Sequence, residues 1–275
     1  MTRVVCALSG GGAKAAAHVG AWKALDEWGA RPAHLAATSM GAVIGACFAA
    51  GLSYDDVLWR ITRLTRRDVA ALHPAAALGY FSEALLRAAP LRGAIARLVP
   101  ARAFRDLAIP LTVTSVDRAN GQLVLFGAGG REDVPLVDAL YASCALPFYY
   151  PPAVIAGREY VDGGLRAVLP IDVATRFAPD LIVAVAVGPS FYEEPARMRA
   201  PVPPLLRTAG DTLRIMMAAQ AEATILAWRG RADPPVMIVR PPTIAESTFQ
   251  LDLIPHYVEE GYRATVRELF LREGW

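Results

Sequence analysis

Two short apolar runs, each followed at once by a small-residue turn and then by a longer apolar run, constrain the fold of this chain most. Residues Val4–Leu8 and His34–Ala37 have the continuous apolar character of strands that are buried on both faces of a parallel sheet. The longer runs, residues 15–28 and 40–50, fit helices, and a glycine follows each of them. Because parallel strands are joined by crossovers that are usually helical, this pattern predicts an α/β fold.

The same alternation continues along the rest of the chain. The Asn-Gly pair at residues 120–121 predicts a hairpin between two of the later strands. Together these runs predict a three-layer α/β/α fold with a mostly parallel central sheet, in a single domain over residues 1–275. The Pro-punctuated segment at about 68–108 is interpreted as short helices that form a lid over the core. The other strands are expected at residues 111–115, 123–126, 155–161 (with a turn at Gly157), 181–187 and 236–239, and the other helices at 54–64, 139–146, 205–228 and 255–271.

Composition limits the classes of function. The chain has 275 residues, 54% of them apolar, which suffices for one sizeable core. Its formal net charge of +2 gives no electrostatic case for binding nucleic acid. The three cysteines lie in apolar stretches, which indicates reduced core thiols and a cytoplasmic protein rather than a disulfide framework. We expect no metal and no cofactor.

One uncharged stretch, residues 35–52, approaches the length of a membrane span. It contains Thr38, Ser39 and three glycines, and its first part favours a strand whereas its second part favours a helix. We therefore interpret it as a buried strand–turn–helix unit.

Ser39 is a candidate nucleophile. A serine hydroxyl needs exposure, a base and stabilisation of the oxyanion that it creates. A sharp turn from strand to helix would expose Ser39 beside a helix N-terminus, where negative charge is favoured, and Gly41 would allow the tight entry into the helix. The alternative is that Thr38 or Ser39 only caps the helix. Ala37 stands where the usual pattern has glycine.

The glycines at residues 10–12 follow the first strand, and successive backbone N–H groups there can converge on one point, as in an oxyanion hole. A nucleotide-binding loop is the alternative. The sequence lacks Gly-x-x-x-x-Gly-Lys-Ser/Thr, and Ala15 stands where Gly-x-Gly-x-x-Gly has its last glycine, although alanine can also close that motif. The absence of an acidic residue about 20 positions later, after a good second strand, weakens the dinucleotide alternative further.

Asp162 leaves a short apolar strand and enters a double-glycine turn. Aspartate is common in turns, and a turn residue is the alternative. An aspartate held beside Ser39 could instead accept the serine proton directly, if burial raised its basicity. In the order Ser, Asp, His, only His256 follows Asp162, and no loop pattern surrounds it. We therefore disfavour a histidine-containing triad.

Four ordered motifs carry a resemblance to a known family. By these motifs the chain resembles the bacterial patatin-like phospholipases over nearly its whole length, and a patatin-like fold is implied. The motifs are Leu8–Lys14 with His18-Val19-Gly20, Thr38–Ala42, Ala142–Pro147, and Tyr160–Gly164 with Pro170–Ala174.

The resemblance implies hydrolysis of acyl esters of phospholipids and other lipids, by a dyad rather than a triad. Ser39 would be the nucleophile that carries the acyl group, and Asp162 the general base. Backbone N–H groups around Gly10, Gly11 and Gly12 would form the oxyanion hole. Supporting positions are Lys14, which would orient the glycine loop or meet an anionic group, with structural anchoring as the alternative, and the turn glycines Gly41, Gly163 and Gly164.

Two further functions stay open. One is an esterase or thioesterase of the same fold that acts on soluble acyl substrates. The other is a non-catalytic acyl- or membrane-binding protein, which the departures at Ala15 and Ala37 motivate. The expected partners are a lipid or acyl-ester substrate and, peripherally, the inner membrane surface, with no nucleic acid; the oligomeric state is left open.

Apolar side chains within residues 205–228 could line an acyl-chain site, with ordinary core packing as the alternative. A cluster of arginines could meet lipid phosphates, although a solvated basic face is the preferred interpretation. These arginines are Arg60, Arg63, Arg66 and Arg67.

Overall fold

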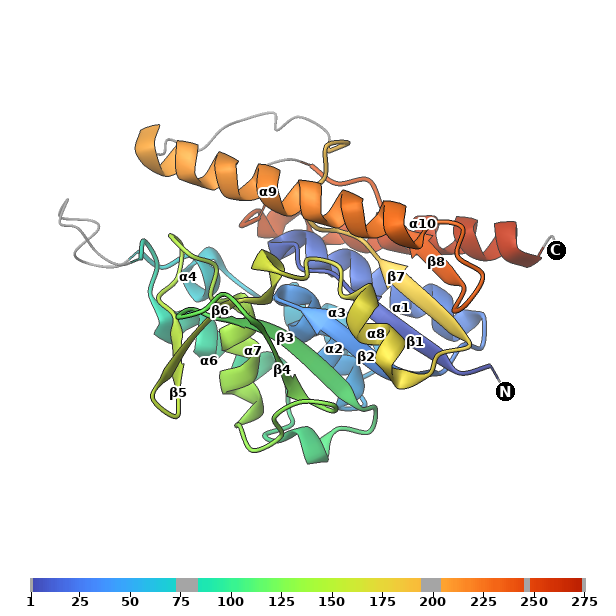
Figure 1. Cartoon of the computed structure of the whole chain (residues 1–275), viewed down its shortest axis with the longest axis horizontal. Coiled ribbons are helices and arrows are strands. Elements are labelled where there is room, and N and C mark those ends of the chain that lie inside the picture. The colour runs from blue at the N-terminus through green and yellow to red at the C-terminus, as the bar shows by residue number, and fades with distance from the viewer. Residues whose placement is uncertain (1, 73–83, 194–203, 245–247, 274–275) are drawn as a thin grey trace.

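An eight-stranded mixed sheet runs through the middle of the computed structural model, which describes residues 2–72, 84–193, 204–244 and 248–273 (Figure 1). The strand order is β5-β6-β3-β2-β1-β7-β8, with β4 also paired to β3. β1 pairs in parallel with β2 and β7, as do β2 with β3 and β7 with β8. The strands are β1 Val4–Leu8, β2 Pro32–Thr38, β3 Leu111–Asp117, β4 Leu123–Gly127, β5 Ala153–Ile155, β6 Arg158–Asp162, β7 Leu181–Val185 and β8 Val236–Val239.

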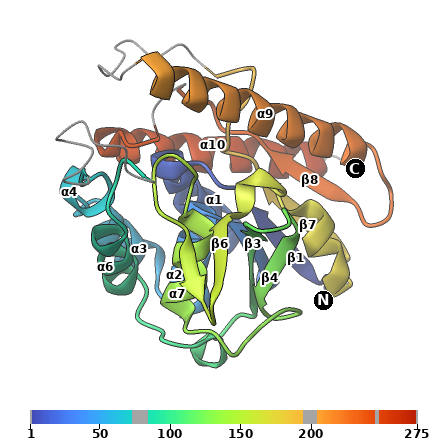
Figure 2. The ribbon, with the colours of Figure 1, turned by 60° about the vertical axis from the view of Figure 1, so that its left-hand side comes forward.

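Helices cover both faces of the sheet, as the α/β/α prediction requires (Figure 2). Alternate side chains of β1 face opposite layers. Cys6 and Leu8 belong to the larger buried cluster, which includes residues of α1, α2, α3, α6, α7 and α10, whereas Val5 and Ala7 belong to a smaller cluster with α8 and the end of α9. The helices are α1 Ala17–Glu27, α2 Met40–Ala49, α3 Tyr54–Ile61, α4 Arg66–Val69, α6 Ala88–Leu98, α7 Leu136–Cys144, α8 Ile171–Ala174, α9 Pro204–Trp228 and α10 Ile254–Glu273.

The predicted α/β/α architecture is confirmed, with local differences. The chain 155–161 forms parts of two strands, because the turn at Gly157 separates β5 from β6. These two strands and β4 are antiparallel to their neighbours, so the edge beyond β3 departs from the parallel pattern. The short helix α8 was not predicted, since four residues give too little periodicity to detect.

The predicted lid segment lies only partly in the described chain. α6 and the end of α4 fall within 68–108, and residues 73–83 lie outside the described residues. Four side chains of α6 are buried in the core, so this helix packs as part of the domain. The lid stays a prediction.

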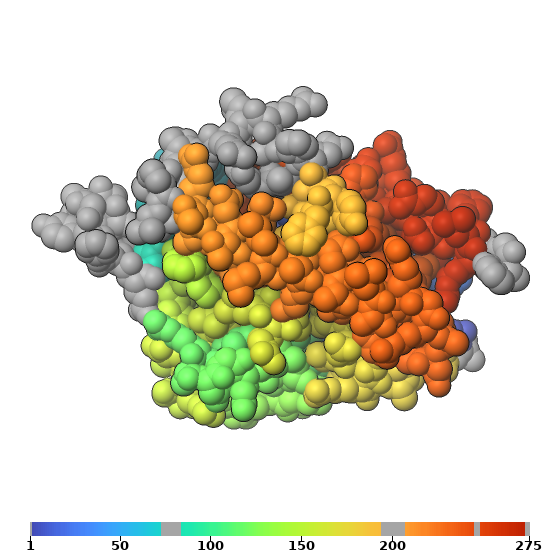
Figure 3. All heavy atoms as spheres, turned by 45° about the horizontal axis from the view of Figure 1, so that its top comes forward, coloured from blue at the N-terminus to red at the C-terminus, as the bar shows by residue number. Residues whose placement is uncertain are grey.

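α9 lies across one side of the molecule and is fastened there by its C-terminal half. Figure 3 shows it exposed along this face, beside the segment that follows β7. The Gln220 side-chain oxygen accepts a hydrogen bond from the Val168 N–H at 2.7 Å, and the Trp228 indole N–H donates to Asp172 at 2.9 Å. The N-terminal half of α9 is thereby held over the carboxyl ends of β1 and β2, where the candidate site lies.

Candidate active site

Ser39 lies on the turn that joins β2 to α2, in a strained backbone conformation. Its φ of 54° and ψ of −134° are unusual for a residue with a β carbon, and such strain often accompanies functional positions. Its N–H donates to the Ser143 hydroxyl at 2.7 Å. The residue is partly exposed, so its hydroxyl is accessible. Ser39 caps α2 through its backbone and not through a side-chain hydrogen bond.

Close backbone approach explains two of the glycines in the site. A β carbon on Gly41 would lie 2.3 Å from the Ser9 carbonyl oxygen, so a larger residue would push α2 away from the glycine loop. A β carbon on Gly10 would lie 3.1 Å from the Ser39 β carbon. The glycine loop therefore packs directly against the candidate nucleophile.

Asp162 ends β6 and reaches Ser39 from the neighbouring part of the sheet. The Ser39 hydroxyl donates to one carboxylate oxygen, Oδ2, at 2.7 Å, and the Gly164 N–H donates to the other at 2.7 Å. The Asp162 side chain is almost fully buried. Burial raises the pKa of its carboxyl from 3.8 to about 6, against the opposing effect of the two hydrogen bonds.

The three glycines of the loop are not equivalent. Gly10 is buried, and its N–H donates to the Val168 carbonyl at 3.1 Å. Gly11 and Gly12 are partly exposed, and their N–H groups have no hydrogen-bond partner among the residues that the structure describes. Gly12 has a φ of +58°, which favours glycine. Among the three predicted oxyanion-hole residues, the N–H groups of Gly11 and Gly12 are thus unpaired within the described chain, whereas the N–H of Gly10 ties the loop to Val168.

Lys14 anchors this loop. Its ammonium forms a buried ion pair with Glu193, and Lys14 is 4% exposed. Burial lowers the pKa of Lys14, while Glu193 opposes this effect. The Ala13 N–H donates to the Thr248 carbonyl at 2.8 Å, which fixes the next residue of the loop. This geometry agrees with the anchoring alternative and with a lysine that orients the loop.

Histidine does not approach the Ser39–Asp162 pair in the described part of the chain. His18 is buried, and its Nε2 bonds to the Ser9 carbonyl at 2.8 Å. Since a carbonyl can only accept, this nitrogen carries the proton, and burial lowers the pKa of His18 to about 4. His34 bonds to Thr112, and His256 is exposed against Tyr257.

A cavity of about 910 Å³ contains the Ser39 and Asp162 side chains and the three loop glycines. Most of its wall is apolar, as an acyl-chain site requires. Of the four arginines that the sequence singled out, only Arg66 lines it. The apolar wall includes Met40, Ile44, Ile61, Leu64, Val69, Leu91, Leu146, Leu213, Met217, Phe249, Leu251 and Ile254.

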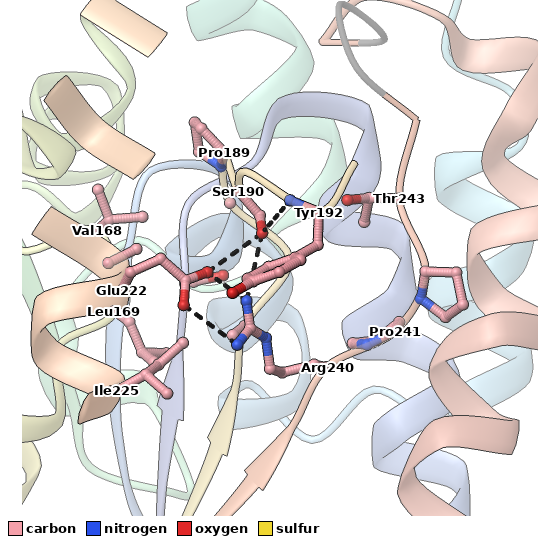
Figure 4. A pocket seen from close by; sticks show the side chains of 15 residues that line it. Val168, Leu169, Pro189, Ser190, Tyr192, Glu222, Ile225, Arg240, Pro241 and Thr243 are labelled. Atoms are coloured by element: carbon pink, nitrogen blue, oxygen red, sulfur yellow. Dashed lines mark hydrogen bonds and ion pairs between the residues drawn. The ribbon is translucent and has the colours of Figure 1, made fainter. Parts of the chain in front are cut away.

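A second, smaller pocket of about 230 Å³ lies beside the C-terminal half of α9, between this helix and the ends of β7 and β8 (Figure 4). Its charged side chains, Glu222 and Arg240, form a two-pronged ion pair. The Ser190 hydroxyl bridges the two, lying 3.2 Å from Glu222 and 3.3 Å from Arg240. Arg240 also lies over the Tyr192 ring, 5.2 Å from its centre. The polar groups of this pocket thus bind one another and fasten α9 to the sheet.

The sequence matches a known protein family. The family model for patatin-like phospholipases matches residues 6–175, which is more than half of the chain and includes Ser39, Asp162 and the glycine loop. The chain belongs to the patatin-like phospholipase family. Residues 204–273, which supply α9 and α10, lie beyond the matched region.

Relatives of this patatin-like chain include longer proteins. It is 34% identical over 198 residues to an NTE family protein of Mycobacterium tuberculosis, covering 70% of this chain and 52% of that protein. It is 28% identical over 188 residues to human patatin-like phospholipase domain-containing protein 6, covering 67% of this chain and 13% of that protein. The chain thus spans about half the length of the mycobacterial relative.

Two solved structures share the fold at low identity. VipD from Legionella pneumophila matches with a TM-score of 0.51 and 14% identity, over 98% of this chain and 66% of that one. The type III effector protein ExoU matches with a TM-score of 0.50 and 14% identity, over 99% of this chain and 53% of that one.

Several residues of the site carry no sequence signal for their role. Ser143, whose hydroxyl accepts the hydrogen bond from the Ser39 N–H, lies in the motif Ala142–Pro147, and that motif alone does not indicate this role. Glu193 and Thr248 hold the loop from distant parts of the chain. No helix in the described residues is long and apolar enough to cross a membrane, and the described ranges hold no cluster of three metal-ligating side chains.

Proposed function

We propose that this chain is a serine hydrolase that cleaves acyl esters of lipids through Ser39 and Asp162. The observation that carries the proposal is the 2.7 Å hydrogen bond from the Ser39 hydroxyl to a buried carboxylate, at the end of an apolar cavity. A carboxylate with a pKa of about 6 is ionised at neutral pH and more basic than an exposed aspartate. Such a group can take the serine proton without a histidine.

The first half of the reaction forms an acyl-enzyme. The Ser39 oxygen attacks the ester carbonyl carbon while its proton passes to Asp162. The negative charge that develops on the carbonyl oxygen is met by the N–H groups of Gly11 and Gly12, near the N-terminus of α2. The bond to the alcohol then breaks, and the leaving oxygen takes the proton from Asp162.

The second half releases the fatty acid. Water attacks the acyl carbon and gives a proton to Asp162, and the oxyanion forms again at the same N–H groups. The bond to the Ser39 oxygen breaks, and that oxygen recovers the proton from Asp162. The products are a fatty acid and the deacylated alcohol, and the enzyme returns to its starting state.

Three further observations support a lid, contact with a lipid surface and a cytoplasmic location. Val69 of α4 and Leu91 of α6 line the cavity, which supports a lid role for part of residues 68–108 within one domain. Ile215 and Met216 are exposed on the outward side of α9, 49% and 66%, which supports peripheral contact with a lipid surface. The described cysteines are buried free thiols, which supports a cytoplasmic location.

Labelling with a fluorophosphonate tests the proposal, because this reagent reacts with activated serines. The wild-type protein should be labelled, Ser39→Ala should not, and Ser190→Ala, a control serine in the smaller pocket, should be labelled as the wild type is. If the wild type is not labelled, the proposal is wrong and the non-catalytic alternative is favoured. If Ser39→Ala is labelled as strongly as the wild type, another serine reacts and the Ser39–Asp162 dyad is wrong. Hydrolysis of short soluble esters but not of lipid vesicles would favour the soluble-substrate alternative.

A further inference from the structure

The inner side of α9 brings one arginine close to the proposed reaction centre. Met217 lies against the turn that holds Asp162, since a β carbon on Gly164 would lie 2.7 Å from the end of the Met217 side chain. Arg214 lies one helical turn before Met217 and lines the same cavity as Ser39. The wall of this cavity also includes Lys14 and the loop glycines. The positive charge of Arg214 helps to lower the pKa of Lys14.

Arg214 has no partner for its charge among the described residues. Its Nε is buried without a hydrogen bond, and no described carboxylate lies within ion-pair distance of its guanidinium. Glu193, the acidic residue at the loop, is already paired with Lys14. A buried guanidinium N–H without a partner is costly, so its retention at a cavity wall points to a ligand that supplies the acceptor.

The other charged groups of the cavity are arranged differently. Arg66 and Arg207 are exposed, Asp252 is exposed, and Asp211 is partly exposed, so water solvates them in the free protein. Asp211 lies one turn before Arg214 on α9 but forms no ion pair with it. Arg214 is therefore the cation of this wall that is both partly buried and uncompensated in the described chain.

We propose that Arg214 binds the phosphate group of the acyl-ester substrate and so selects phosphoglycerides over neutral esters. This inference rests on the proposed function, because it needs the ester carbonyl at Ser39. In a phosphoglyceride only a few bonds separate the ester from the phosphate. With the ester carbonyl at Ser39, the phosphate would therefore lie in the same cavity, whose wall includes Arg214. Arginine suits this role because its planar fork of N–H donors matches phosphate oxygens.

The test compares two substrates with the same acyl chain, lysophosphatidylcholine and monoacylglycerol, in mixed micelles of one neutral detergent. We expect Arg214→Gln to raise KM for the lysophospholipid about tenfold or more, the usual effect of losing a charge-assisted hydrogen bond, and to change the monoacylglycerol reaction less than about twofold. Arg214→Lys should recover part of the loss. Arg229→Gln, at the far end of α9, makes the same charge change outside the cavity and should behave as the wild type.

Equal losses on both substrates would show that Arg214 supports the fold, for example by compensating Glu193, and would overturn the inference. No loss on either substrate would overturn it as well. In both cases the hydrolase proposal would stand, whereas a wild type inactive on both substrates and unlabelled at Ser39 would overturn the hydrolase proposal itself.

A binding measurement keeps the inference testable without turnover. Ether analogues of the two lipids cannot be hydrolysed, and the wild type should bind the phosphate-bearing analogue about tenfold more tightly than Arg214→Gln does. Inorganic phosphate at the same concentration should not displace it, because the tethered phosphate is present at a high effective concentration. Displacement by inorganic phosphate would assign the site to the free anion and overturn the lipid assignment.

Discussion

In the smaller pocket, beside the C-terminal half of α9, both charged side chains have partners, whereas the larger cavity, beside the N-terminal half, leaves its central charges with few. Arg240 and Glu222 bind each other and share the Ser190 hydroxyl. In the larger cavity Asp162 has hydrogen bonds only from Ser39 and Gly164 among the described residues, and Arg214 has no carboxylate there. The first arrangement holds a helix in place, and the second leaves groups available for chemistry.

This difference has a physical origin. A buried ion pair gains from its mutual attraction and loses from removal of water, so the net effect on stability is small as long as both partners are present. A buried carboxylate without a cation has a desolvation cost that its two hydrogen bonds only partly offset, and the remainder appears as a raised pKa. The fold tolerates that cost at the site where a basic carboxylate is useful.

The largest effect should come from removing the unpaired carboxylate. Asp162→Asn is expected to lower kcat at least about 10³-fold, because the amide cannot accept the serine proton. The fold should persist, since the amide oxygen can still accept from the Gly164 N–H. Asp172→Asn is the matched control, because Asp172 binds the Trp228 indole on the other side of the sheet. Wild-type activity in Asp162→Asn would reject Asp162 as the base.

The pH dependence should follow the same carboxylate. Its pKa in the folded protein, about 6, lies above its ordinary value, so its ionisation costs stability in the folded state. That cost is absent below about pH 4 and is fully present above about pH 6. Catalysis needs the ionised form, so kcat/KM should fall about tenfold per unit below pH 6 and level off above it.

The raised pKa of Asp162 also predicts a pH-dependent difference in stability. Asp162→Asn should be more stable than the wild type at pH 8, by on the order of 1–3 kcal/mol, and the difference should vanish below about pH 4. Urea unfolding at both pH values measures it. A wild type whose activity is flat from pH 4 to 8 would contradict the raised pKa.

At the paired charges Glu222 and Arg240, in contrast, we expect a loss of stability with little loss of activity. Glu222→Gln leaves Arg240 without its counter-ion and should lower the free energy of unfolding by about 1–3 kcal/mol, with little change in the chemistry. Arg214→Met, in the larger cavity, should leave stability unchanged or raise it, because it removes an uncompensated cation. Thermal unfolding of both variants measures this difference, and equal effects would show that the two charged sites contribute to stability in the same way.

The smallest effect should come from the serine that holds the nucleophile. Ser143→Ala removes the acceptor of the Ser39 N–H. Loss of this hydrogen bond should destabilise the strained conformation of the turn by about 1 kcal/mol. We expect kcat to fall by roughly 3–10-fold with KM nearly unchanged. A large change in KM with an unchanged kcat would show that Ser143 acts on substrate binding instead.

Local chemistry made the fold and the centre of the site predictable. The turns at Ser39 and Asp162 follow apolar strands directly, so their residue types predicted both positions, and the structure places the two side chains 2.7 Å apart. The capping box of Ser53 and Asp56 at the start of α3 is another feature of this local kind, because it depends on neighbours within one turn. The catalytic roles themselves stay predictions.

Features that depend on distant packing could not be predicted. Nothing near Gly10 indicates that its N–H is donated to Val168, so the sequence does not distinguish it from Gly11 and Gly12, whose N–H groups have no partner among the described residues. α9 is apolar on most sides, so its sequence does not reveal that Arg214 and Met217 face the cavity. The arginines near Arg66 formed a visible cluster, yet Arg60 donates to the Arg97 carbonyl and Arg63 lies over Trp59.

The anchoring of the glycine loop has a consequence for how this protein can be divided. The family-matched part, residues 6–175, contains Ser39 and Asp162, but the loop is held by three residues beyond it. The Ser9 hydroxyl accepts from the Val187 N–H, Lys14 pairs with Glu193, and Ala13 bonds to Thr248. A fragment that ended at residue 175 would therefore keep Ser39 and Asp162 and lose the contacts that hold the glycine loop. In this chain the family-matched region, residues 6–175, therefore depends on later residues for the position of its glycine loop.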